Sequence, residues 1–273
     1  MRDALPYPMP ASERISFVYF EHKSIDRDGS ALVAFDKSSI GKIEVPIGRT
    51  LILMLGPGCR ISHAGVALCA LEGATLLWVG EFGVRLYAAA NPRGNSERLL
   101  QQASMRLDET KRLVAAKRLF FEMFQERAPD RRSIEQIRGL EGARVKTIYA
   151  DLANSHQVRW TGRSQNMGDP LNASISAATS ALYGLCEAVI LALGYSPAIG
   201  FVHDGDPRSF VFDLADTIKF ETVVPLAFGI FAESPSDIER RVRVACRDLF
   251  FRESIAEKLV LTLERLFCAN GID

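Results

Sequence analysis

Four side chains in the second half of the chain have the types needed for chemistry on phosphates. Glu141 lies between two glycines in Arg138-Gly139-Leu140-Glu141-Gly142-Ala143-Arg144. His203 follows an apolar run that leads into a turn rich in aspartate and glycine, and Asp213 and Asp216 come shortly after it. Carboxylates with one imidazole form a mixed oxygen and nitrogen ligand set, which suits Mg²⁺ or Mn²⁺ better than structural Zn²⁺. Such a cation can activate water or a hydroxyl group for displacement at phosphorus.

Each of these residues also has an ordinary structural explanation. Glu141 can pair with Arg138 or Arg144 at a spacing of three residues, and spacing alone favours that explanation. A glycine in a helix interior costs about 1 kcal/mol relative to alanine, so the two glycines indicate a helix break or a close approach. A lone histidine at the end of an apolar run is more often a hydrogen-bonded structural residue than a ligand. Asp213 and Asp216 are three residues apart and share a helix face, although Asp213 can serve only to complement a helix N-terminus.

Basic and aromatic side chains supply candidate contacts to nucleic acid. Lys219 is one turn beyond Asp216, where it can reach a phosphate held by the metal. Arg240 and Arg243 share a helical stripe, for which a solvated surface is the commoner meaning. Tyr183 can stack on a base, but a place in the core is the more common role of such a tyrosine. The other candidates lie in turns or at strand ends: Arg60, Arg85 and Arg163.

The sequence predicts that an α+β architecture positions these residues. Short runs rich in β-branched and aromatic residues predict strands at 15–20, 31–35, 43–47, 51–55, 76–79 and 84–87, with one helix at 62–71. The segment Asn91-Pro92-Arg93-Gly94-Asn95-Ser96 breaks the pattern. Apolar periodicity then predicts helices at 99–105, 113–124, 134–152, 174–193, 214–232 and 238–267. We therefore expect a small N-terminal β domain (1–91) followed by a larger all-helical catalytic domain (92–273).

Composition narrows the class of protein. With 273 residues, 48% of them hydrophobic, the chain can bury one large core or two moderate ones. The net charge is zero, but residues 91–150 hold 13 basic and 8 acidic side chains, 13 − 8 = +5, which suits phosphate binding beside an acidic site. Five cysteines without a CxxC pair indicate neither a zinc ribbon nor a disulfide framework, and favour the reducing cytoplasm. The longest apolar runs are far too short to span a membrane. The sequence contains no Walker loop and no GxGxxG motif.

Four stretches together resemble a known family. They are Pro57-Gly58-Cys59-Arg60-Ile61-Ser62-His63-Ala64, Trp78-Val79-Gly80-Glu81-Phe82-Gly83-Val84-Arg85, the Glu141 segment, and Gly200-Phe201-Val202-His203 through Asp216-Thr217-Ile218-Lys219-Phe220. The sequence is similar to the CRISPR-associated spacer-acquisition integrases of type I-E over about residues 8–267. The resemblance implies that Glu141, His203 and Asp216 bind Mg²⁺ or Mn²⁺, that Asp213 accompanies them, and that Arg60, Arg85, Lys219, Arg240 and Arg243 contact DNA.

The resemblance also implies a reaction and partners. The reaction is transesterification, in which the 3′-hydroxyl of a foreign DNA fragment attacks a phosphodiester of a CRISPR array. The partners are double-stranded and branched DNA, a second copy of the chain in a homodimer, and a small dimeric adaptation protein. His22 stands where relatives often carry a tyrosine thought to wedge the duplex end, and the loop from Arg163 to Asp169 is short. The alternatives are a non-catalytic nucleic-acid-binding scaffold, whose carboxylates serve only in ion pairs, and a metal-dependent RNase or phosphodiesterase.

Overall fold

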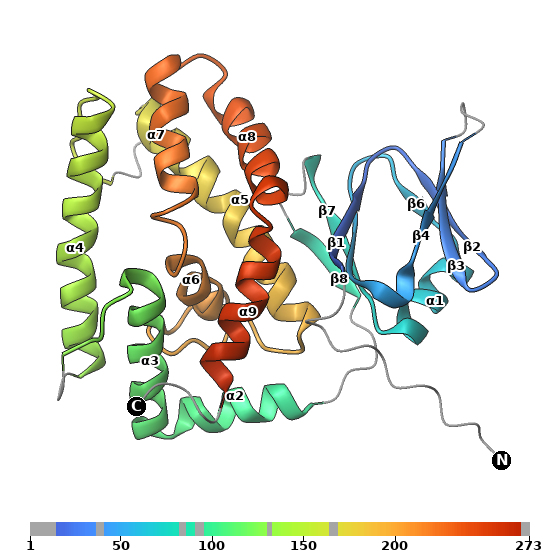
Figure 1. The fold of residues 1–273 in the computed structure, drawn as a ribbon, viewed down its shortest axis with the longest axis horizontal. Helices are drawn as coiled ribbons and strands as arrows, with labels where there is room; N and C mark the ends of the chain where they lie inside the picture. Colours follow the sequence, from blue (N-terminus) through green and yellow to red (C-terminus); the bar gives the residue numbers. More distant parts are fainter. Residues whose placement is uncertain are drawn as a thin grey trace.

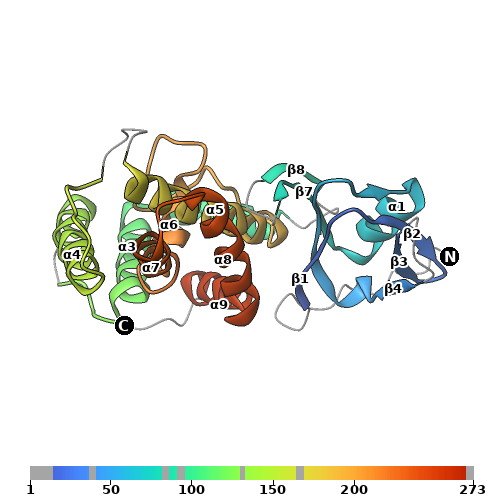
Figure 2. The same cartoon turned by 90° about the horizontal axis from the view of Figure 1, so that it is seen from above.

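Strands fill the first third of the molecule and helices the remainder, which confirms the predicted α+β class (Figure 1). The structure is a computed structural model, and it describes residues 15–36, 41–81, 86–90, 96–129, 133–163 and 169–268. Arg85 and the break at 91–95 lie outside the described residues, so the expected domain boundary stays a prediction. Seen from above, the β part and the helical part lie side by side along the long axis (Figure 2).

Two four-stranded sheets form the β part. The first has the order β1-β5-β7-β8, in which β1 (Ile15–Phe20), β5 (Thr50–Leu55) and β7 (Thr75–Val79) are parallel and β8 (Leu86–Ala90) is antiparallel to β7. The second has the order β4-β3-β2-β6, built from β4 (Lys42–Val45), β3 (Ala31–Phe35), β2 (Ser24–Asp28) and β6 (Arg60–Ile61). The predicted strands at 15–20 and 31–35 are confirmed. The sequence did not predict β2, because only Ile25 in it is buried and no apolar alternation marks it.

Strand β5 joins the two halves of the molecule. All six of its residues are buried, as expected of a strand covered on both faces. Ile52 and Met54 belong to the core of the helical part, whereas Leu53 and Leu55 belong to the core between the two sheets. Because successive side chains of a strand point to opposite faces, one short apolar run serves both cores. Helix α1 (His63–Glu72), capped by Ser62, covers the second of these cores.

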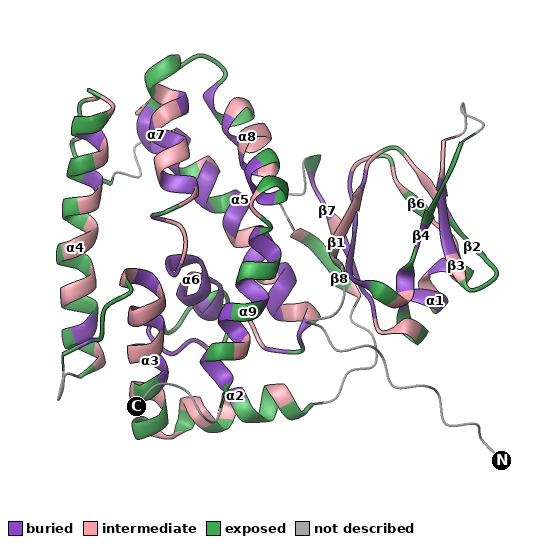
Figure 3. Ribbon diagram, in the orientation of Figure 1, coloured by how far each residue is buried: buried purple, intermediate pink, exposed green. Residues whose placement is uncertain are grey.

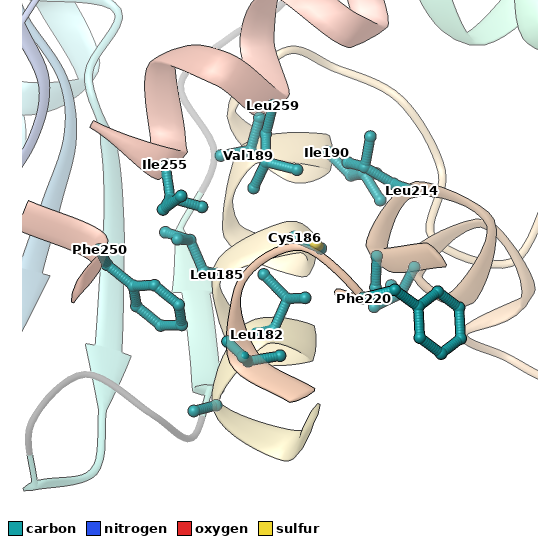
Figure 4. Packing of buried hydrophobic residues seen from close by; sticks show 14 of the residues in the cluster. Leu182, Leu185, Cys186, Val189, Ile190, Leu214, Phe220, Phe250, Ile255 and Leu259 are labelled. Carbon is teal, nitrogen blue, oxygen red and sulfur yellow. The ribbon is translucent and has the colours of Figure 1, made fainter. Parts of the chain in front are cut away.

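The helical part is built around α5 (Pro170–Ala192). Leu182, Leu185, Cys186, Val189 and Ile190 pack along it against the helices beside it (Figure 4). By length and composition α5 could cross a membrane, but 56% of its apolar window is buried inside the molecule, as in the core helix of a globular protein. Around it stand α2 (Glu97–Leu107), α3 (Glu109–Phe124), α4 (Ile134–Ser155), α6 (Ser209–Asp216), α7 (Val223–Glu233), α8 (Ile238–Arg252) and α9 (Ile255–Phe267).

Two of the helices that the sequence predicts as continuous are each divided into two helices in the structure. The prediction of one helix over 214–232 is wrong, because α6 ends at Asp216 and α7 begins at Val223. Thr217 and Thr222 donate their hydroxyls to the carbonyls of Leu214 and Ile218, a local bond that competes with helical continuation. The helix predicted over 238–267 is likewise divided into α8 and α9. Ser254 lies between them in the left-handed region, at φ 48°.

Helix α4 runs without interruption through Glu141, so the expected helix break there is wrong. Helix α4 stands at the edge of the molecule beside α3 and α7 (Figure 1). A Cβ added at Gly139 or Gly142 would meet no atom within 4 Å, so neither glycine marks a close approach by another part of the backbone, and the approach of a ligand stays a prediction. Both glycines are exposed. Their cost in helix propensity is offset by the capping box at Ser133 and Gln136, which satisfies the first turn.

Candidate active site

Glu141, His203, Asp213 and Asp216 line one small cavity between α3, α4 and α6. The free space among them is about 10 Å³, room for one water-sized atom. The apolar side of the cavity comes mainly from α3 and the first turns of α4, with Val202 from the loop: Ala116, Leu119, Phe120, Met123, Ile137 and Val202. Glu141 therefore meets three polar side chains from a segment more than 60 residues later in the chain, against a hydrophobic wall. Nothing in the sequence assigns α3 to the site, because its Leu and Phe residues look like ordinary core positions.

Asp213 holds the backbone that carries His203. Its Oδ2 accepts hydrogen bonds from the amides of Phe201 (2.5 Å) and Val202 (3.1 Å). Its Oδ1 lies 2.8 Å from the amide of His203 and 2.8 Å from Nδ1 of the His203 ring. The Asp213 side chain is fully buried, and these four contacts use its acceptor capacity. Asp213 is thus placed to position His203 rather than to bind an ion itself.

The contact with Asp213 also orients the imidazole. An ionised carboxylate only accepts hydrogen bonds, so Nδ1 of His203 is the donor in this contact, and Nε2 carries a lone pair when the ring is neutral. A carboxylate behind a histidine is the arrangement that fixes ring orientation and basicity in metal sites. The hydrogen bond with Asp213 raises the pKa of His203, and burial opposes that rise. The segment before His203 is irregular, although its apolar run alone resembles a buried strand.

The loop before His203 is too tightly packed for any residue but glycine at one position. A Cβ added at Gly200 would lie 2.5 Å from the carbonyl oxygen of His203 and 2.8 Å from Cβ of Ser209. Both distances are below any normal carbon contact, and the first involves backbone that cannot step aside. The glycine therefore lets the loop fold back onto the start of α6, where seven of eight residues are buried (Figure 3).

Glu141 is the desolvated acid of the site. Burial, followed by the negative charge of Asp216, raises the pKa of Glu141 to about 7, while His203 and Lys219 act in the opposite direction. A carboxyl group with this pKa is close to half protonated at neutral pH, so it exchanges a proton easily for another cation. The expected ion pair of Glu141 with Arg144 does not form. Arg144 instead contacts Glu126 at 2.5 Å and stacks over Phe120 and Phe124.

Asp216 and Lys219 form a buried ion pair. Oδ1 of Asp216 lies 2.5 Å from Nζ of Lys219, and the two side chains are 6% and 15% exposed. The ammonium of Lys219 is therefore the cation that faces this buried oxygen. Burial acts to lower the pKa of Lys219, but Asp216 and two tyrosines raise it above its ordinary value. Lys219 is therefore a fixed positive charge beside the cavity.

The donor set fits a divalent cation in chemistry, although the side chains do not surround a common centre. Within the ranges that the structure describes, no three His, Cys, Asp or Glu side chains are grouped closely enough to hold one ion. The observation that favours an ion is that the carboxyls of Asp216 and the desolvated Glu141 line the same small cavity as His203, close enough that Asp216 raises the pKa of Glu141. Two carboxylates facing one lysine leave negative charge that a cation would offset.

The residues predicted to contact DNA are spread over both halves of the molecule. Tyr183 and Lys219 lie beside the cavity, where Tyr183 packs edge-on against Phe212. Arg163 donates to the Asn172 side chain and to Ser176 at the start of α5. Arg240 and Arg243 begin α8 and pair with Asp237 and Glu239.

The β part carries the rest of that set. Arg60 is exposed on β6, in the second sheet. His22 lies just past the end of β1 at φ 55°, and its amide donates to the carbonyl of Pro57 at 2.9 Å. Arg85 falls outside the described residues. The cavity thus gathers the four predicted catalytic residues, Tyr183 and Lys219 lie near Asp216 outside its lining, and Arg60, Arg163, Arg240 and Arg243 lie on other elements.

Comparison with known proteins gives the family. The family described as CRISPR associated protein Cas1 matches residues 120–237, the span that holds all four cavity-lining polar residues. The CRISPR-associated endonuclease Cas1 of Geobacter sulfurreducens is 46% identical over 272 residues, covering 97% of this chain and 89% of the relative. That of Escherichia coli strain K12 is 48% identical over 271 residues, covering 97% and 88%. The crystal structure of a TtCas1-DNA complex matches with a TM-score of 0.86 at 37% identity, covering 96% of this chain and 100% of that chain. The chain therefore belongs to the Cas1 family.

Proposed function

We propose that this protein is a metal-dependent DNA endonuclease and integrase, which inserts foreign DNA fragments into a CRISPR array through attack by a 3′-hydroxyl. The observation that carries the proposal is the meeting of Glu141, His203 and Asp216 in one cavity, with His203 oriented by Asp213. The family adds support, because its relatives are named endonucleases and one similar structure is a complex with DNA. Double-stranded and branched DNA are the proposed substrates.

The proposed cofactor is Mg²⁺ or Mn²⁺, held by Glu141, His203 and Asp216. A divalent ion would supply charge stabilisation at the phosphate and lower the pKa of an attacking hydroxyl. The protein's own part is to desolvate Glu141 with the apolar side chains of the cavity, such as Phe120, and to exclude bulk water. Asp213 holds Nδ1 of His203, which leaves Nε2 as the ring nitrogen for the ion. Lys219 is placed to neutralise a phosphate oxygen once Asp216 turns toward the ion.

Phosphodiester exchange needs no external energy source, because one phosphodiester bond replaces another. The 3′-hydroxyl oxygen forms the new bond to phosphorus, and the 3′-oxygen of the cut strand leaves with a proton. Glu141, whose pKa is raised to about 7 in the metal-free site, would release its own proton on binding the ion. We further propose that Arg60, Arg85, Arg163, Arg240 and Arg243 contact the DNA backbone. Homodimer formation, the small dimeric partner and a cytoplasmic location belong to the same proposal.

A non-catalytic scaffold is the second candidate, and one observation favours it. The Asp216–Lys219 pair and the absence of a closed ligand group among described residues are what a structural ion-pair cluster would show. The raised pKa of Glu141 is not explained by that alternative, since a carboxylate serving an ion pair would have its pKa lowered.

Strand transfer by the purified protein separates the two candidates. The assay measures joining of a labelled DNA fragment into a duplex carrying a CRISPR repeat, with Mn²⁺, with Mg²⁺ and with EDTA. Glu141→Gln and His203→Asn should each lower the rate by about 10² or more. The matched controls are Glu126→Gln, an exposed glutamate, and His156→Asn, a histidine that stacks on Phe228 outside the cavity. Equal rates in all four variants would rule out the metal mechanism. Preference for RNA would instead favour the phosphodiesterase alternative.

A further inference from the structure

The segment that carries His203 lacks the regular backbone hydrogen bonds of a helix or a sheet. Residues 193–208 connect α5 to α6 without forming a helix or a strand. Buried peptide groups outside regular structure must find hydrogen-bond partners elsewhere. Asp213 supplies three acceptor contacts at the amides of residues 201–203. Before Gly200, the amides of Gly194 and Tyr195 donate to carbonyls of α5, and the carbonyl of Pro197 accepts from the amide of Phe210. The carbonyls of Leu193 and Ile199 and the amide of Ser196 require a different source.

Helix α2 supplies that source from a single face. Arg98 donates from Nη1 to the carbonyl of Leu193 at 3.1 Å. Arg106 contacts Asp204 at 2.5 Å, directly after His203. Gln102 lies between these two arginines, and a spacing of four residues places all three on one side of the helix. The stripe therefore follows the segment from its beginning to the residue after the histidine.

Gln102 makes the central contacts of the stripe. Its Nε2 donates to the carbonyls of Ser196 (3.0 Å) and Ile199 (2.9 Å), and its Oε1 accepts from the amide of Ser196 (2.8 Å). Gln102 is fully buried, and it is the buried residue of an otherwise half-exposed or exposed helix. A buried amide with both donors and its acceptor matched specifies one position of the backbone that it contacts.

We propose that Gln102 is a positioning residue for His203, acting together with Asp213 from the opposite side. Gln102 fixes the turn at Ser196–Ile199, and Asp213 fixes Phe201–His203. Gly200 connects the two, packed so tightly against the His203 carbonyl that a shift on one side is transmitted to the other. The ring of His203 therefore reaches the cavity only while α2 holds the turn. This inference rests on the proposed function for its catalytic consequence, but not for its structural content.

The test replaces Gln102 by methionine, which keeps the volume and removes three hydrogen bonds. The matched control is Gln101→Met, the neighbouring residue on α2. Gln101 is exposed, and its Nε2 donates to the carbonyl of Phe267 in α9, so this variant removes a side-chain hydrogen bond of α2 without removing one to residues 193–208. Amide hydrogen exchange of residues 199–203 and the kinetics of strand transfer are measured for both variants and wild type.

Gln102→Met should speed exchange at residues 199–203 by about tenfold or more and lower kcat by about tenfold, with KM changed less than about twofold. Gln101→Met should change neither quantity at these residues. Wild-type exchange rates in Gln102→Met, or equal losses in the two variants, would overturn the inference. If Gln102→Met does not fold, Gln102→Asn replaces it, because that variant stays uncharged and keeps the amide group but is one methylene too short to reach all three partners. If the wild-type protein performs no strand transfer, the proposed function fails, and the exchange comparison alone decides whether Gln102 holds the segment.

Discussion

Replacing Glu141 by glutamine should make the metal-free protein more stable above neutral pH. The carboxyl of Glu141 has its pKa raised from 4.5 to about 7, chiefly by burial and then by the charge of Asp216. The folded protein therefore binds this proton more tightly than the unfolded chain does. The free energy of unfolding falls as pH rises from about 4.5 to about 7, and the full cost of the buried charge is present above that range. Glutamine has no charge to desolvate.

The size of the effect follows from the two pKa values. The difference between 4.5 and about 7, at about 1.4 kcal/mol per pH unit, gives an upper limit of about 3.4 kcal/mol. The side chain is only partly buried, so solvent screening reduces the expected gain to about 1–2 kcal/mol. For a helical unit of this size, that gain corresponds to an increase in Tm of about 2–8 °C.

Thermal and urea unfolding in EDTA at pH 5 and pH 8 measure the difference. Glu141→Gln should exceed wild type at pH 8 and nearly equal it at pH 5. Adding Mn²⁺ at pH 8 should stabilise wild type and not the variant, because an ion that binds only the folded state raises its stability by mass action. Glu126→Gln, an exposed control on the surface, should change stability by less than about 0.5 kcal/mol at either pH. A Glu141→Gln protein no more stable than wild type at pH 8 would refute the reasoning.

Four further predictions concern the same cavity. Asp213→Asn should destabilise the fold by about 3 kcal/mol, since one carboxylate holds three amides and an imidazole, and urea unfolding checks it. Lys219→Met should lower stability at pH 8 by about 2 kcal/mol or more by leaving Asp216 buried without its cation, and urea unfolding at pH 8 measures the loss. Gly200→Ala should abolish strand transfer while far-ultraviolet circular dichroism keeps its helical signal, because the clash lies at the His203 carbonyl. Mn²⁺ affinity, measured by titration calorimetry, should rise between pH 6 and pH 8, since Glu141 and His203 both have raised pKa values and must lose protons to bind; a flat profile would contradict their ligation.

The local pattern of the sequence was sufficient for much of the fold. Alternating and continuous apolar runs located β1, β3 and β5, and periodicity located α3, α4 and α5. The sequence pattern failed where local side-chain hydrogen bonds end a helix whose apolar periodicity continues, and where a strand has almost no buried residues. The apolar spacing continues across Thr217–Thr222, so only the threonine-to-carbonyl bonds reveal the end of α6. Short β2 has a single buried residue and no pattern to read.

The site was predictable in residue type and less so in role. A glutamate, a histidine and two aspartates were identified as a hard-metal set, and the structure places them around one cavity. The residue types alone could not predict that the carboxylate of Asp213 accepts hydrogen bonds only from the loop and the ring of His203, or that Asp216 pairs with Lys219. They also could not reveal Gln102, because its partners are backbone atoms nearly a hundred residues away. Such contacts depend on tertiary packing and leave no spacing in the sequence.

Anomalous diffraction from crystals grown with Mn²⁺ is the most direct test of the central claim. The account predicts one strong peak in the cavity, within ligand distance of Glu141, Nε2 of His203 and Asp216, with Asp213 still bonded to the loop and Lys219 released from Asp216. A cavity without Mn²⁺ at a concentration that supports strand transfer, or an ion bound to other side chains, would contradict it.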